Sequence, residues 1–136
     1  MGAISRREWL KGAAAAWAIA QGGSGGVAAW AAELPRARPA KPDRHFTSAV
    51  VESLIPRVQR VIGDPALSII FENCFPNTLD TTVYPGTFEG KPDTYVVTGD
   101  IDAMWLRDSS AQVWPYLPLA KDDAQLRELL EGVIRR

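Results

Sequence analysis

The sequence predicts an all-α protein with long loops and a minor β element. Apolar residues recur at three- and four-residue spacing over residues 46–62, and the pattern restarts at residues 64–73. A third amphipathic pattern covers residues 122–134. Between the second and third patterns the chain is rich in Pro, Gly, Thr, Asn and Asp, and only residues 94–99, "TYVVTG", look like a strand. Loops of this length inside a small helical domain are usually functional.

The ends of these helices are marked by ordinary capping signals. Pro56 interrupts the first pattern and should kink or split that helix. Asp64 can cap the second helix with Pro65 at its first position, so a helical hairpin should turn at Gly63 and Asp64. Asp122, followed three residues later by Gln125, predicts the start of the last helix as a capping box.

Composition excludes several classes of protein. The chain has 15 basic and 16 acidic side chains in 136 residues, which argues against a nucleic-acid binder with a clustered basic face. Cys74 is the single cysteine, so neither an intrachain disulfide nor a cysteine-cluster metal site can form, and we expect it to be a small buried apolar residue. The single histidine, His45, should face solvent and is a poor candidate for a catalytic base.

The N-terminus has the order of features found in an export signal. A short basic region with Arg6 and Arg7 precedes a weakly apolar run, and "AWA" at residues 29–31 matches the small-x-small cleavage pattern. "SRREWLK" resembles the twin-arginine motif, so we expect residues 1–31 to be a signal peptide recognised by the twin-arginine export machinery. The alternative, a permanent membrane anchor, is disfavoured because glycines dilute the apolar run. The protein should be periplasmic or secreted, with residues 32–44 as a Pro- and Arg-rich linker and residues 45–136 as the folded part.

The segment "GDIDAMWLRDSS" places three carboxylates, an arginine and a tryptophan close together. Carboxylates accept hydrogen bonds from vicinal hydroxyls, and an indole stacks on the apolar face of a sugar, so the segment suits a carbohydrate site. Two alternatives stand beside this interpretation. Arg107 could form a buried ion pair with Asp108 or Asp100, or Asp108 could simply cap the helix that follows. Asp100-x-Asp102 could also hold a divalent metal, as in glycosyltransferases that use nucleotide sugars.

Two longer segments resemble one family. "FENCFPNTLDTTV" (residues 71–83) and "YVVTGDIDAMWLRDSSAQVWPYLPLA" (residues 95–120) are similar to the metal-independent exo-α-mannosidases of glycoside hydrolase family 125. The resemblance implies the N-terminal part of an (α/α)₆ barrel whose loops bind a mannose-containing glycan. It implies removal of terminal α-1,6-linked mannose with inversion, without a metal ion or other cofactor. Inversion needs two carboxyl groups about 6.5–9.5 Å apart, and the resemblance places this acid and base beyond Arg136.

The same resemblance assigns substrate-binding residues to two loops. The first loop is expected to line the terminal-mannose subsite with Arg107, Asp108, Asp100, Trp105 and Asp102. The second loop is expected to approach the same subsite with Asn77, Asp80 and Thr81. An equally weighted alternative is that residues 77–81 are turn residues whose side chains form hydrogen bonds with their own backbone. The sequence stops within a helical pattern, so we expect a fragment of a longer enzyme that is inactive alone. The alternative functions are a non-catalytic sugar-binding protein and the metal-dependent glycosyltransferase.

Overall fold

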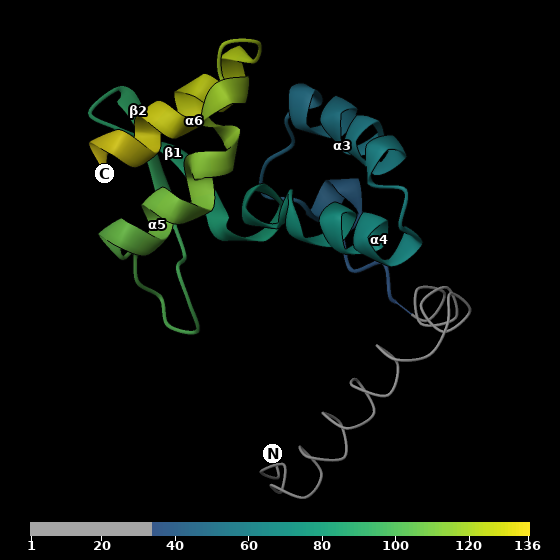
Figure 1. Ribbon diagram of the computed structural model, residues 1–136. Coiled ribbons are helices and arrows are strands. Elements are labelled where there is room, and N and C mark those ends of the chain that lie inside the picture. The colour runs from purple at the N-terminus through teal and green to yellow at the C-terminus, as the bar shows by residue number, and fades with distance from the viewer. Residues whose placement is uncertain (1–33) are drawn as a thin grey trace, which may run out of the picture.

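A computed structural model describes residues 34–136, and the expected signal peptide lies outside the described residues. The described part is mainly helical with one β-hairpin (Figure 1). Its elements in chain order are η1 (Lys41–Asp43), α3 (Ala49–Ile62), α4 (Pro65–Cys74), η2 (Thr78–Thr82), β1 (Val83–Phe88), β2 (Lys91–Val96), α5 (Leu106–Val113), η3 (Trp114–Leu119) and α6 (Ala124–Arg135). The helical fold class is thus confirmed, together with the minor β element.

Helices α3 and α4 form the predicted helical hairpin. Gly63, in the left-handed conformation with φ 69°, ends α3, and the Asp64 side chain then accepts the Leu67 amide at 2.9 Å to begin α4. Pro56 lies inside α3, but the helix is not split there. Cys74, expected to be buried, is instead exposed as the last residue of α4.

The sequence predicts one strand at residues 94–99, whereas the structure has a two-stranded hairpin whose second strand, β2, covers residues 91–96. Strands β1 and β2 pair over six positions in antiparallel register, from Val83 opposite Val96 to Phe88 opposite Lys91. Glu89 and Gly90 connect them with φ of 50° and 74°, the backbone of a two-residue hairpin turn that suits the twist of the strands. The sequence alone missed β1 because "VYPGTF" contains Pro and Gly, which usually indicate loops.

The last helix begins one residue later than predicted. Asp123, not Asp122, is the N-cap of α6, and its carboxylate accepts the Leu126 amide at 3.0 Å. The Ser48 hydroxyl caps α3 and donates to the same carboxylate at 2.6 Å. This long-range bond favours Asp123 over Asp122 as the cap, because Ser48 and Asp123 then cap α3 and α6 and also bond to each other.

The core lies where α6 covers the hairpin and η3 joins the two halves of the molecule (Figure 1). Its buried apolar side chains come from α3, η2, both strands, α5, η3 and α6: Val51, Ile55, Leu79, Val83, Val96, Val113, Tyr116, Leu126, Leu129 and Leu130. The Tyr116 hydroxyl donates to the Phe75 carbonyl, which ties η3 to the end of α4. Burial raises the pKa of Tyr116 to about 12, so this donor keeps its proton at physiological pH.

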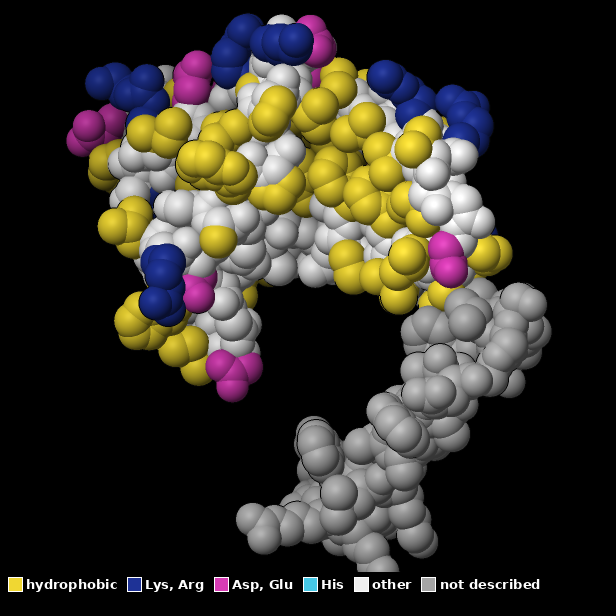
Figure 2. All heavy atoms as spheres, viewed as in Figure 1, with side chains coloured by type: hydrophobic (Ala, Val, Ile, Leu, Met, Phe, Trp, Pro, Cys, Tyr) yellow, Lys and Arg dark blue, Asp and Glu magenta, His cyan; other side chains and the backbone are white. Residues whose placement is uncertain are grey.

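One face of the molecule remains apolar at its surface. Figure 2 shows hydrophobic side chains gathered across the middle of this face, over the helices on both sides. Exposed apolar residues on α5, η3 and α6 contribute to the surface, including Leu106, Trp114 and Ile134. None of the helices in residues 34–136 combines the length and the hydropathy that a membrane span needs.

Candidate functional site

The loop between β2 and α5 is closed at its base by one threonine. The Thr98 amide and hydroxyl both donate to the Ala103 carbonyl, at 3.2 and 2.9 Å, and the Trp105 amide donates to the Thr98 hydroxyl at 3.1 Å. The residues between them form a tight projecting loop (Figure 1). Thr98 therefore fixes the backbone that carries Asp100 and Asp102. The sequence did not reveal this role, because threonine is common in strands and Thr98 lies within the predicted strand.

A concavity of about 790 Å³ lies between this loop and the outer face of the hairpin. Asp100 and Asp102 line it from the loop, while Tyr84 and Tyr95 line it from the strands and Arg136 from the end of α6. Loss of hydration and then a hydrogen bond to Asp102 raise the pKa of Tyr95 above its ordinary value. The concavity thus brings together acceptors and aromatic rings, the groups with which proteins bind sugars.

Trp105, Arg107 and Asp108 lie at the start of α5 and outside that concavity. The Arg107 side chain is 92% exposed, and its Nε is 3.8 Å from Asp108 Oδ2. The buried ion pair considered from the sequence is therefore absent, and these charges are available to a ligand. Asp108 is also not the cap: Trp105 is the N-cap residue and Asp108 lies in the first turn, where its charge favours the helix dipole.

The second predicted loop forms η2, and its polar residues have mainly local or buried partners. The Thr81 hydroxyl donates to the Asn77 carbonyl at 2.8 Å, as the turn interpretation expected. Asp80 is only 2% exposed, and Arg38 Nε and Nη2 donate to its two oxygens at 2.8 and 3.1 Å. None of the three residues lines the concavity. In the described residues Asp80 has a structural role.

Arg38 and its partners form a charged cluster that the sequence did not predict. The guanidinium also donates to both oxygens of Glu52, at 2.6 and 3.3 Å, while Arg44 donates to Glu52 at 3.3 Å. Burial opposes the charge of Arg38, but bonds to Asp80 and Glu52 outweigh it and raise the arginine pKa. Burial likewise opposes the charge of Glu52, yet the Arg38 hydrogen bond lowers the pKa of that carboxyl. Residues 34–44, expected to be a linker, are thus held against α3 and η2.

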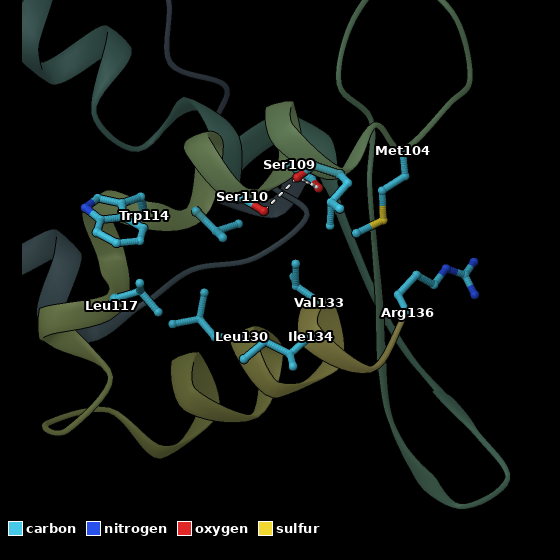
Figure 3. Close-up of a pocket in the computed structure, with 11 residues that line it drawn as sticks. Met104, Ser109, Ser110, Trp114, Leu117, Leu130, Val133, Ile134 and Arg136 are labelled. Atoms are coloured by element: carbon cyan, nitrogen blue, oxygen red, sulfur yellow. Dashed lines mark hydrogen bonds between the residues drawn. The ribbon is translucent and has the colours of Figure 1, made fainter.

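A second groove, of about 560 Å³, lies between α5 and α6 (Figure 3). Its lining is apolar apart from Arg136 at one end and two serines on α5. Both serine hydroxyls are already used, since Ser109 donates to the Trp105 carbonyl at 2.9 Å and Ser110 to the Leu106 carbonyl at 2.6 Å. With both hydroxyl hydrogens engaged and no carboxylate in its lining, the groove offers fewer polar groups to a sugar than the concavity lined by Asp100 and Asp102, so we favour the loop and its concavity as the site.

The acidic residues of the site do not gather as a metal centre. Within the described range, no three His, Cys, Asp or Glu side chains lie together in a way that could hold an ion. Asp100 and Asp102 instead share their concavity with aromatic rings and an arginine.

A helical scaffold that presents a loop of acids, tryptophan and arginine suits the class of carbohydrate-binding proteins. Comparison with known proteins makes the class specific: residues 64–136 match the family described as metal-independent alpha-mannosidase (GH125). The chain is also 48% identical over 103 residues to the meiotically up-regulated gene 157 protein of Schizosaccharomyces pombe, covering 75% of this chain. It spans 20% of the length of that relative. The chain belongs to glycoside hydrolase family 125, as the sequence motifs predicted.

Proposed function

We propose that the protein carrying this chain is an exo-acting α-mannosidase that removes terminal α-1,6-linked mannose with inversion and without a metal ion. Family membership supports the reaction class, and the exposure of Arg107 beside Asp108 and Trp105 supports a sugar-binding role for the loop. An arginine that is 92% exposed and only weakly paired contributes little to stability, so its place beside an exposed tryptophan is best explained by a ligand.

In this proposal the chain supplies part of the sugar subsite, and the acid and base lie beyond Arg136. Arg107 donates to mannose hydroxyls, Asp108 accepts from them, and the Trp105 ring forms a wall of the subsite. Asp100 and Asp102 offer further acceptors from the same Thr98-closed loop. The chain alone should therefore bind sugar weakly and not cleave it. In the whole protein we propose the (α/α)₆ barrel as the fold in which this chain forms the first helices.

The test is Arg107→Ala in the protein expressed from its complete reading frame, assayed with an α-1,6-linked mannobiose. Loss of a charged hydrogen-bond donor to the substrate should lower kcat/KM by about tenfold or more. The thermal midpoint should hardly move, because the side chain is exposed. Lys121→Ala, a change of another exposed cation outside the site, is the matched control. A lowered midpoint with proportionate loss of activity would instead assign Arg107 to the fold.

Two measurements on the unmodified protein separate the alternative functions. Binding of mannobiose without any hydrolysis would identify a non-catalytic sugar-binding protein. Complete loss of activity on addition of a chelator would support the metal-dependent transferase that uses Asp100 and Asp102, and would contradict the metal-independent mechanism.

We propose in addition that residues 1–31 direct export through the twin-arginine machinery to the periplasm or the cell exterior. The support is the order of basic, apolar and small-residue regions in the sequence. Replacing both Arg6 and Arg7 by Lys should retain the protein in the cytoplasm, as cell fractionation would show. Unchanged export of this double variant would exclude the twin-arginine route.

A further inference from the structure

Two tyrosines lie side by side on the outer face of the β-hairpin. The register places Tyr84 directly opposite Tyr95. Their neighbours Val83 and Val96 are fully buried, and side chains alternate between the two faces of a strand, so both tyrosines face away from the core. Tyr84 is 51% exposed. A cross-strand aromatic pair on the solvent side of a hairpin contributes little to the core.

Each ring is held by a partner from another part of the chain. The His45 ring contacts Tyr84 with 4.6 Å between centroids. The Arg136 guanidinium lies 5.2 Å above the centre of the Tyr95 ring, and Asp93 holds that guanidinium at 2.7 Å. These contacts fix the two rings before any ligand arrives, which lowers the entropy cost of binding on them.

The rings open onto the concavity that Asp100 and Asp102 line from the other side. Its volume of about 790 Å³ lies within the range of small-molecule sites, about 300–1,000 Å³. Aromatic rings on one wall and carboxylates on the other match the apolar faces and the hydroxyls of pyranose rings. Arg107 and Asp108, where we place the terminal mannose, do not line this concavity, but Asp100 and Asp102 of the same loop do, so the concavity adjoins the terminal-mannose subsite.

We propose that Tyr84 and Tyr95 form an aromatic platform that binds the sugars on the reducing side of the cleaved bond. The proposal rests on the proposed function. An exo-acting enzyme accepts nothing beyond the terminal mannose, so further sugars of the glycan can extend only toward the reducing end. The platform would then set the preference for oligosaccharides over substrates that have a single sugar.

The test compares two substrates in the protein expressed from its complete reading frame. α-Mannosyl fluoride has no second sugar, whereas α-1,6-linked mannotriose extends across the platform. Tyr84→Ala should lower the ratio of kcat/KM for mannotriose to kcat/KM for the fluoride by about tenfold, mainly through KM for mannotriose. Tyr84→Phe keeps the ring and should keep the ratio.

Phe88→Ala is the matched control, because Phe88 is an exposed aromatic residue on the same hairpin that does not line the concavity. It should leave both substrates unaffected. The platform is refuted if Tyr84→Ala leaves the ratio unchanged or lowers both substrates equally.

A separate measurement distinguishes failure of the platform from failure of the proposed function. If the unmodified protein hydrolyses neither substrate, the proposed mannosidase is wrong, and calorimetric binding of mannotriose decides the platform. Binding that is weakened about tenfold by Tyr84→Ala but not by Phe88→Ala would retain the platform as a glycan-binding site. Absence of binding to the unmodified protein would exclude it.

Discussion

Arg38→Ala should destabilise the fold far more than the position of Arg38 in a Pro-rich segment would indicate. The Arg38 side chain is only 10% exposed and makes four hydrogen bonds to Asp80 and Glu52, at 2.6 to 3.3 Å. Removing one partner of a buried ion pair typically costs about 3–5 kcal/mol, because the other charge remains buried. Arg44 Nε stays 3.7 Å from Asp80 and compensates in part, so we expect the low end, about 3 kcal/mol.

Urea denaturation at neutral pH, followed by tryptophan fluorescence, measures this loss in the protein expressed from its complete reading frame. With ordinary m-values, a loss of about 3 kcal/mol lowers the midpoint by about 1–3 M. Arg36→Ala is the matched control, since Arg36 also pairs with a glutamate, Glu72, but its side chain is 66% exposed. Such a surface pair contributes about 0–1 kcal/mol.

A third variant, Arg38→Lys, separates charge from geometry. Lysine keeps the positive charge but lacks the planar fork that reaches both carboxylates at once, so it should recover only part of the lost stability. Equal midpoints for Arg38→Ala and Arg36→Ala would refute the assignment, because the buried cluster would then contribute no more than a surface pair. Full recovery by Lys would show that charge alone suffices.

Two further predictions concern the packing of α6. Asp123→Ala should cost about 1–2 kcal/mol at pH 7 through loss of the cap, whereas Asp122→Ala should change stability by less than about 0.5 kcal/mol. Burial opposes the charge of Asp123, but hydrogen bonds to its carboxylate lower its pKa below the ordinary value of 3.8. The folded state therefore binds fewer protons, the stabilisation is fully present above about pH 5, and it is lost as pH falls through the lowered pKa. Thermal melts of both variants from pH 7 to pH 2 test this, and a larger effect of Asp122 would contradict it. Gly132→Ala should cost about 1–3 kcal/mol, because its Cβ would overlap the Thr94 hydroxyl and lie 2.8 Å from the Thr94 amide nitrogen. In Gly86→Ala the new Cβ would meet only a backbone oxygen at 3.7 Å, so chemical denaturation should show no loss of stability.

The sequence predicts those parts of the fold that depend on local signals. The Gly63, Asp64 and Pro65 boundary was correct because each residue acts within one turn of its own position. The start of α6 was wrong by one residue, because Ser48, 75 positions away, decides which aspartate becomes the cap. Strand β1 was missed for a related reason, since its pairing partner rather than its composition makes it a strand.

The candidate site shows the same division. The family and its two motifs could be identified from the residues, and the family comparison confirms that identification. The local sequence pattern could not predict the hydrogen-bond partner of each polar side chain. Asp80 and Asp100 look alike in the sequence, yet Arg38 takes both oxygens of Asp80, whereas Asp100 lies exposed at a concavity. The tyrosines of that concavity were missed because their alternation with Val83 and Val96 becomes visible only once β1 is known.

The contrast between the two sets of charges supports the assignment of the site. The cluster around Arg38 has almost every donor and acceptor paired, as expected where charge must be buried in a fold. The loop after β2 has the opposite character: Thr98 makes its backbone rigid, while Asp100, Arg107 and Trp105 are left exposed. Ordering a loop costs conformational entropy, and contacts of these exposed side chains within the described part of the chain contribute little free energy to offset that cost. Rigid presentation of unpaired polar groups is what a binding site requires, because the ligand then supplies the missing partners.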